Sequence, residues 1–391
     1  MVAVAQALAS RGHQPIIAAP PDFGDWIRGL GFEFAGTGID VNAFLQQNRD
    51  ILGANAMKFV SITRELFERE LPAQMDLLLE LARGADAIVF GGGSVTAPSV
   101  REILGIPVLG VLFTTAVLPS REHAPVVVPW RALPKWVNAL LWRFSGGMWN
   151  RLMRDALNGA RARHRLPPVG DVVEHLFTDT PFVVAVDAGV LPIDGEIAQR
   201  VPPVGFLFYE PPDTALDPEL SAWIDDGEAP IYIGFGSMTG RGPERMRRVI
   251  VEAIGALGRR ALVSRGWANL GGDLPGGWRA IGDTPHKLLF PRMACVVHHG
   301  GSGTTAAALR AGVPQVLVPL ILDQYHHAQR LYEERIAPKP TAMEKISAPQ
   351  LAAAIRDAMS MDPAPRQRAA ERIRASRAAD EIVDRIETLA R

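Results

Sequence analysis

Short apolar runs alternate with helical patterns along most of the chain of 391 residues. Continuous apolar runs, rather than alternating polar and apolar positions, are typical of strands that are buried on both faces of a sheet. In the first half, we predict strands at residues 14–19, 32–35, 87–90, 108–112, 182–186 and 202–205. In the second half, we predict strands at residues 231–235, 261–264, 278–281, 295–297 and 316–318. Helical patterns lie between these runs, so the sequence predicts an α/β fold with parallel sheets.

A proline-rich, acidic stretch at residues 210–230 divides the chain into two units. We predict one doubly wound domain over residues 1–212 and a second over residues 213–365. The last segment, residues 366–391, belongs to a long predicted helix of mixed charge, 363–389, which we expect to cross back to the first domain.

The chain opens with a helical pattern, residues 2–9, that precedes the first predicted strand. A parallel α/β domain usually opens with a strand, so we expect that a first strand and its loop are missing ahead of this helix. A later helical pattern, residues 54–83, contains Pro72, which predicts a break or a kink.

The strand–turn–helix–strand unit of residues 295–324 carries the strongest candidate chemistry. Its glycines, Gly300, Gly301 and Gly303, allow backbone N–H groups to approach a ligand closely. The helix that follows begins with N–H groups that lack partners, and it ends at Gly312. Side-chain donors gather at the same helix end, namely His299, Ser302, Thr304 and Thr305. These groups predict a phosphate site. The alternative is a tight turn without a ligand.

Composition narrows the classes of function. A net charge of -1 provides no global field for a nucleic acid, and we find no recognition motif for DNA or RNA. The single cysteine, Cys295, allows neither an internal disulfide nor a cysteine metal cluster, which fits a reducing compartment. No apolar run approaches the roughly 20 residues of a membrane span, and we expect no secretory signal. We therefore expect a cytoplasmic protein.

The segment from Trp130 to Asp155 differs in character from its surroundings. It contains four tryptophans and five basic residues, and its only acidic residue is Asp155. Two interpretations stay open. The segment forms a helical lid that grips an apolar substrate or lies on a membrane surface, or it forms amphipathic helices that pack on the first domain.

Several motifs together resemble a known family. They are Ile-Gly-Phe-Gly-Ser-Met at 233–238, Pro-His-Lys-Leu-Leu-Phe-Pro at 285–291, His-His-Gly-Gly-Ser-Gly-Thr-Thr at 298–305, Gly-Val-Pro at 312–314 and Asp-Gln at 323–324. Nearly the whole chain resembles GT-B nucleotide-sugar glycosyltransferases, in the branch of sterol glucosyltransferases and bacterial macrolide or glycopeptide glycosyltransferases. The resemblance implies two Rossmann-like domains that face a central cleft. The first would bind the acceptor, and the second would bind the sugar donor.

The resemblance also implies roles for individual residues. His299 and the N–H groups of Ser302, Gly303 and Thr304, next to Gly301, would hold the donor diphosphate in place of a metal ion. The other implied donor contacts are Ser237 beside the phosphates, Ile281 and His286 around the base and ribose, and Asp323 and Gln324 on the sugar hydroxyls. Plant members carry an acidic ribose ligand where Ala307 stands here. The implied reaction is an inverting transfer of a hexose from a UDP- or dTDP-sugar to an apolar acceptor such as a sterol, a lipid or a polyketide, without a cofactor.

The catalytic base is not identified in this sequence. The resemblance implies an Asp in a loop after the first strand, where we expect the missing segment. His13 lies near the amino edge of its predicted strand, so we interpret it as structural. Nothing marks Asp22 as a base. A donor-binding but catalytically impaired transferase is therefore one alternative.

Two further alternatives come from other classes. Gly301-x-Gly303-x-x-Ala306 fits a loose dinucleotide fingerprint, which would suit an NAD-dependent oxidoreductase. A metal site could also be assembled from histidines, although neighbouring residues on a strand point to opposite faces. Its candidate ligands are His298, His299, His326 and His327.

Overall fold

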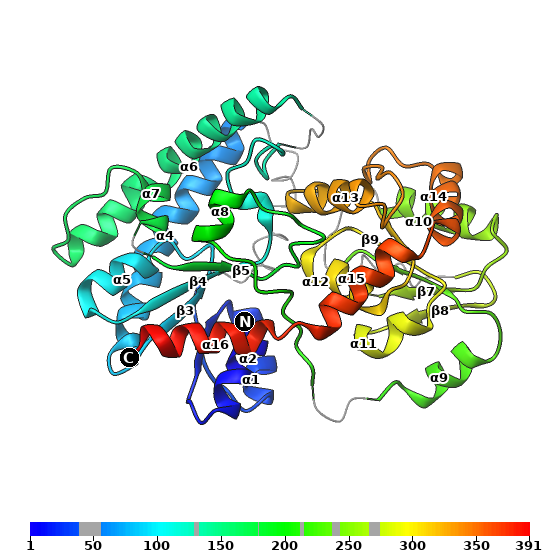
Figure 1. The fold of residues 1–391 in the computed structure, drawn as a ribbon, viewed down its shortest axis with the longest axis horizontal. Helices are drawn as coiled ribbons and strands as arrows, with labels where there is room; N and C mark the ends of the chain where they lie inside the picture. The colour runs from blue at the N-terminus through cyan, green and yellow to red at the C-terminus, as the bar shows by residue number, and fades with distance from the viewer. Residues whose placement is uncertain (39–55, 129–132, 179, 212–214, 237–242, 266–273) are drawn as a thin grey trace.

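The computed structural model describes residues 1–38, 56–128, 133–178, 180–211, 215–236, 243–265 and 274–391. Two α/β lobes lie side by side (Figure 1). The first lobe contains the elements from α1 to α8, and the second contains those from α9 to α15. The last helix, α16, returns to the first lobe. One buried apolar cluster is shared between the lobes, because it joins residues of β3–β5 with residues of α12, α13 and α15.

The sheet of the second lobe has the strand order β10-β9-β6-β7-β8, and every neighbouring pair is parallel. Its strands are β6 (Ile231–Gly234), β7 (Ala261–Ser264), β8 (Trp278–Ile281), β9 (Cys295–His298) and β10 (Gln315–Leu317). The first strand, β6, is central: the chain adds β7 and β8 on one side of it and β9 and β10 on the other. The strand order therefore reverses between β6 and β9, which is where doubly wound sheets bind ligands.

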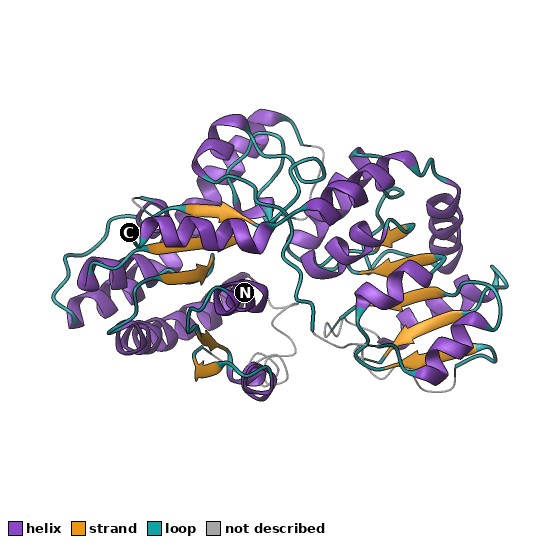
Figure 2. Ribbon diagram, turned by 60° about the horizontal axis from the view of Figure 1, so that its bottom comes forward, coloured by secondary structure: helices purple, strands orange, loops and turns teal. Residues whose placement is uncertain are grey.

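Parallel strands of the first lobe form a three-stranded sheet, β3-β4-β5, and a separate pair, β1-β2 (Figure 2). These strands are β1 (Ile16–Ala19), β2 (Glu33–Gly36), β3 (Ile88–Gly91), β4 (Val108–Leu112) and β5 (Phe182–Val184). The predicted strand at 202–205 is wrong, because only an isolated bridge joins Pro203 to Val184. Pro202 and Pro203 have no N–H groups to donate to a strand ladder.

Helices cover the sheets of both lobes. In the first lobe they are α1 (Val2–Ser10), α2 (Gly24–Gly29), α4 (Ala56–Ala82), α5 (Ala97–Leu104), α6 (Lys135–Arg163), α7 (Val172–Phe177) and α8 (Gly195–Arg200). In the second they are α9 (Pro218–Asp225), α10 (Pro243–Gly255), α11 (His286–Leu289), α12 (Ser302–Ala311), α13 (Asp323–Glu333), α14 (Ala348–Ser360) and α15 (Ala364–Ala375). The predicted break at Pro72 is wrong, since α4 continues through it.

The C-terminal segment forms two helices instead of the single long helix that we predicted. The backbone at Ser376 is extended, which ends α15 and lets α16 (Ala378–Leu389) take a new direction. In the first lobe, α16 buries Ile382, Val383 and Ile386 in a cluster with residues of α1, β4 and β5.

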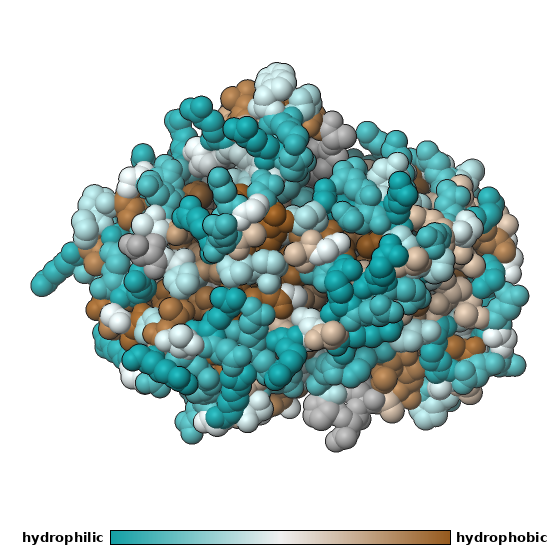
Figure 3. All heavy atoms as spheres, in the orientation of Figure 1, coloured by the Kyte–Doolittle hydropathy of each residue, from teal (hydrophilic) through white to brown (hydrophobic). Residues whose placement is uncertain are grey.

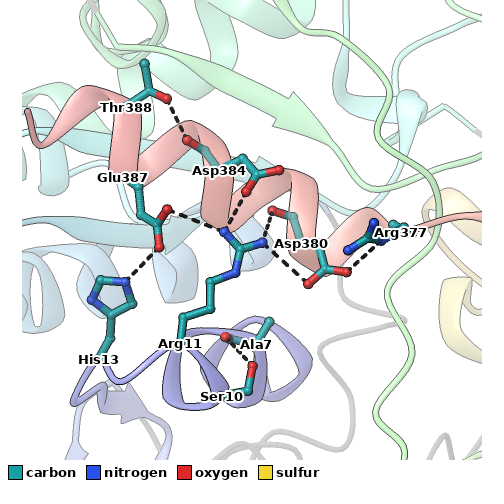
Figure 4. Close-up of polar contacts among 9 residues, drawn as sticks. All are labelled: Ala7, Ser10, Arg11, His13, Arg377, Asp380, Asp384, Glu387 and Thr388. Atoms are coloured by element: carbon teal, nitrogen blue, oxygen red, sulfur yellow. Dashed lines mark hydrogen bonds and ion pairs between the residues drawn. The ribbon is translucent and has the colours of Figure 1, made fainter.

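Polar contacts hold α16 to the end of α1 (Figure 4). Arg11 pairs with Asp384 at 2.5 Å, and His13 Nε2 lies 2.9 Å from a carboxylate oxygen of Glu387. His13 therefore joins the two ends of the chain, in agreement with the structural role predicted for it.

Candidate functional site

The turn after β9 is shaped by His298, a fully buried residue at the end of that strand. The N–H of Gly300 donates to His298 Nδ1 at 3.1 Å, so the ring proton is on Nε2, which lies 3.0 Å from Gln315 Oε1. Burial lowers the pKa of His298 to about 3, so the ring is neutral. His298 is thus a structural support whose two nitrogens are both occupied.

The N-terminus of α12 forms the floor of the candidate site. Gly301 is the N-cap and provides no side-chain cap, and the first turn contains no acidic residue. The first N–H of the helix with an intrahelical acceptor is that of Thr305, bonded to Gly301 O. The N–H groups of Ser302, Gly303 and Thr304 therefore lack the intrahelical acceptors that later residues have. Together with the helix dipole, they provide a site for an anion.

His299 lies against this helix end, with its ring between Gly236 and Gly301. A Cβ added to Gly236 would lie 3.3 Å from the ring, and one added to Gly301 would lie 2.5 Å from Nε2. The buried Nδ1 has no hydrogen-bond partner within the described parts of the chain. Burial lowers the pKa of His299. The negative charge of Asp323 and a hydrogen bond to the Gly234 backbone raise it, but by less. The residue is therefore placed to offer a hydrogen bond from a neutral ring to a bound anion.

An aromatic group lies at the carboxyl ends of β6 and β8. The His286 ring stacks on Phe290 with centroids 4.2 Å apart, and its Nε2 lies 3.5 Å from the hydroxyl of Tyr232. Burial lowers the pKa of His286 to about 4. The side chain of Ile281 is buried in the same apolar cluster. Ile281 and His286 are thus linked through this cluster, because His286 contacts two of its members, Tyr232 and Phe290.

The loop after β10 leads into α13, which begins at Asp323. The amide oxygen of Gln324 accepts hydrogen bonds from the N–H groups of Leu320 and Ile321, so this oxygen holds the loop. Asp323 is partly exposed. The residue before it, Leu322, has a φ of 51° and an exposed side chain, a strained conformation of the kind that clusters at functional sites.

The first lobe reaches this site through residues that directly follow β4. Phe113 O accepts a hydrogen bond of 2.9 Å from Ser302 Oγ, so this hydroxyl joins the two lobes. The hydroxyls of Thr114 and Thr115 contact the two histidines of α13. These residues were not predicted from the sequence. The available signal was their position directly after a predicted buried strand, because the carboxyl ends of parallel strands carry ligand sites.

Other predicted groups lie outside the described residues or are engaged by other parts of the protein. Ser237, Trp130 and Arg131 lie outside the described residues. No group of three potential metal ligands occurs among the residues that the structure describes. His298 and His327 use both ring nitrogens on protein groups. The turn of the dinucleotide fingerprint follows β9, the fourth strand of its sheet along the chain, instead of the first.

Comparisons with known proteins agree with this geometry. The family described as "Erythromycin biosynthesis protein CIII-like, C-terminal domain" matches residues 250–389. "Glycosyltransferase GtfE" of Amycolatopsis orientalis is 34% identical over 362 residues, which cover 89% of this chain and 85% of the relative. "Sterol 3-beta-glucosyltransferase UGT80B1" of Arabidopsis thaliana is 30% identical over 91% of this chain and 60% of its own length.

A solved structure extends the likeness to the fold. The glycosyltransferase VinC, solved in complex with dTDP, aligns with a TM-score of 0.69 at 20% identity and covers 100% of this chain and 95% of its own. These relatives favour a transferase over the oxidoreductase interpretation. The chain belongs to the nucleotide-sugar glycosyltransferases, and it has their GT-B fold.

Proposed function

We propose that the chain transfers a hexose from a UDP- or dTDP-sugar to a hydroxyl of an apolar acceptor, with inversion and without a metal ion. The observation that carries this proposal is the anion site at α12. There, the N–H groups of Ser302–Thr304, which have no intrahelical acceptors, and the Nδ1 of His299, which has no partner among the described residues, lie at the reversal point of a parallel sheet. A diphosphate fits this arrangement because it needs several fixed donors.

The same donors provide the chemistry of the transfer. As the glycosidic bond breaks, negative charge grows on the departing diphosphate. Donors that are already oriented stabilise this charge more strongly than they stabilise the bound substrate. Asp323, at the start of α13, would accept hydrogen bonds from the sugar hydroxyls. Ile281 and His286 would border the base and ribose.

We assign no catalytic base among the described residues. An inverting transfer needs a group that accepts the proton of the acceptor hydroxyl. A second candidate function is therefore binding of the sugar nucleotide with little or no transfer.

A panel of nucleotide sugars distinguishes these candidates, with a sterol and a macrolide as acceptors. Release of the nucleoside diphosphate reports transfer, and calorimetry reports binding. Release that depends on an acceptor supports the transferase. Binding of UDP or dTDP without release supports the second candidate. If neither nucleotide binds, both proposals are wrong.

Helix α6 carries an exposed apolar face that would serve binding of the acceptor. Trp136, Leu140 and Phe144 are exposed by 72%, 60% and 72%, and their spacing of four places them on one face of the helix. Apolar side chains gather at the top of Figure 3, over the N-terminal end of α6. In contrast, Trp142 is partly buried and donates to His123 O at 2.9 Å, and Trp149 packs against the core. The tryptophan-rich segment thus combines packed and exposed positions.

We assign the exposed stripe of Trp136, Leu140 and Phe144 to contact with an anionic lipid surface that holds the acceptor. Arg143 and Arg151 are exposed on the same helix, and cations favour such a surface. No helix in the described ranges is long and apolar enough to span a bilayer. Cosedimentation with phosphatidylglycerol vesicles should fall several-fold in Trp136→Ser/Phe144→Ser. Equal sedimentation of the variant and the wild type would contradict this role.

A further inference from the structure

Two adjacent histidines of α13 contact two adjacent threonines of the first lobe. His326 Nε2 lies 2.8 Å from Thr115 Oγ1, and His327 Nε2 lies 3.0 Å from Thr114 Oγ1. Both histidines are buried, with 2% and 1% of their surfaces exposed. The two pairs therefore form similar links between the lobes.

Only one of these links continues to the candidate diphosphate site through a contact that the structure gives. His327 Nδ1 lies 2.8 Å from Gly300 O. A carbonyl oxygen accepts, so Nδ1 carries a proton, and in the neutral ring Nε2 then accepts from the hydroxyl of Thr114. His326 instead contacts His123, with ring centroids 4.4 Å apart and the rings tilted by 59°.

The Gly300 carbonyl is informative because of the peptide to which it belongs. In a trans peptide, the C=O and the next N–H point in opposite directions. The bond from His327 therefore directs the N–H of Gly301 away from α13 and fixes the start of α12. Gly300 has a φ of 91°, and a Cβ added to it would lie 3.2 Å from the carbonyl oxygen of Gln324, so the turn leaves no room for a side chain beside α13.

We propose that Thr114 and His327 are positioning residues that couple the first lobe to the diphosphate turn. Thr114 holds His327 in the tautomer that donates to Gly300, and His327 in turn holds the Gly300–Gly301 peptide in the orientation that presents the α12 N-terminus to the donor. The contact between lobes thereby raises the affinity for the sugar nucleotide. This inference rests on the proposed function, because it takes the turn as the diphosphate site.

Calorimetric titration with UDP and dTDP tests the coupling, and it requires no turnover. One neutral hydrogen bond corresponds to a ~2- to 10-fold change in affinity. Thr114→Val should weaken nucleotide binding by about this factor. Thr114→Ser keeps the hydroxyl, which can still accept the hydrogen bond from the N–H of Ala116. This variant should bind nucleotide as tightly as the wild type. The matched control Thr115→Val breaks the neighbouring link and should change affinity by less than about 2-fold.

Variants of His327 test the second half of the coupling. His327→Asn places an amide N–H near Nδ1 and should keep the bond to Gly300, so it should weaken binding only as much as Thr114→Val does. His327→Ala loses both bonds and should weaken binding by ~10- to 100-fold. In the His327→Asn background, Thr114→Val should have no further effect. Melting temperatures show whether each variant is folded. If the variants at the buried His327 do not fold, the Thr114 variants alone still test the coupling.

The outcomes separate two kinds of failure. If the wild type binds neither UDP nor dTDP, the proposed function is wrong and the coupling is wrong with it. If the wild type binds but Thr114→Val and Thr115→Val weaken binding equally, the coupling alone is wrong. The coupling alone is also wrong if Thr114→Val weakens nucleotide binding further in the His327→Asn background.

Discussion

Replacing His299 by alanine should remove one hydrogen-bond donor from the diphosphate site without removing a charge. Burial lowers the pKa of this histidine, so its ring is neutral at pH 7.5. Its buried Nδ1 has no partner in the described part of the chain, so the substitution breaks no bond within the protein at that atom. At Nδ1 the expected loss therefore concerns the ligand, whereas the interaction of the ring with the Gly234 carbonyl is a loss within the protein.

The magnitude follows from the type of bond. A hydrogen bond to a charged group contributes ~1.5–3 kcal/mol, which corresponds to a ~10- to 100-fold loss of affinity for UDP or dTDP. The effect on transfer should be larger, about 10²-fold or more, because charge on the diphosphate grows as the glycosidic bond breaks. The gap between these two factors measures the stabilisation that is specific to the transition state.

Calorimetry gives the loss of binding, and release of the nucleoside diphosphate gives the loss of rate. His164→Ala is a matched control, because His164 pairs with Asp76 at 2.7 Å within the first lobe. The control should leave both quantities within about 2-fold of the wild type. If His299→Ala binds nucleotide as tightly as the wild type and transfers as fast, His299 has no part in the site.

Further predictions address the turn, its support and the last helix. Gly301→Ala should lower nucleotide affinity by at least ~10-fold, because its Cβ would lie 2.5 Å from His299 Nε2; an unchanged affinity in calorimetry would contradict this. Gly303→Ala meets no protein atom within 4 Å and should raise the free energy of unfolding by ~0.5–1 kcal/mol in urea denaturation. The pKa of His298 is about 3 when folded and about 6.5 when unfolded, so this residue should lower the stability by ~1.4 kcal/mol for each pH unit between pH 6.5 and pH 3, and His298→Asn should remove this contribution. Ile382→Ala should cost ~2–5 kcal/mol of unfolding free energy, because this residue of α16 is fully buried against the first lobe; a cost below about 1 kcal/mol would show that α16 packs there only loosely.

Much of the fold could be predicted because buried parallel strands leave a local signal. The predicted strands at 108–112, 261–264 and 278–281 have the same bounds as β4, β7 and β8. The failures came from residues whose effect depends on context. Pro202 and Pro203 interrupted an apolar run that otherwise suggested a strand. The chain changes direction at Ser376 because α15 packs on the second lobe and α16 packs on the first. The charge pattern of residues 363–389 does not predict this change.

The candidate site was predictable only where its groups are close in sequence. The glycine turn and the first turn of α12 form one continuous stretch, so their convergence could be inferred. The resemblance assigned the diphosphate to His299 but gave no role in that site to His298. The structure shows that His298 supports the turn, as expected for neighbours that point to opposite sides at the end of a strand. The contact of Thr114 with His327 joins positions 213 residues apart, and no local pattern predicts such a pair.

A crystal structure of the protein with UDP or dTDP would test the central claim most directly. We expect the diphosphate at the N-terminus of α12, with oxygens within about 3.2 Å of the N–H groups of Ser302, Gly303 and Thr304 and of a ring nitrogen of His299. A nucleotide bound elsewhere, with these groups still unpaired, would contradict the assignment of this helix end as the diphosphate site.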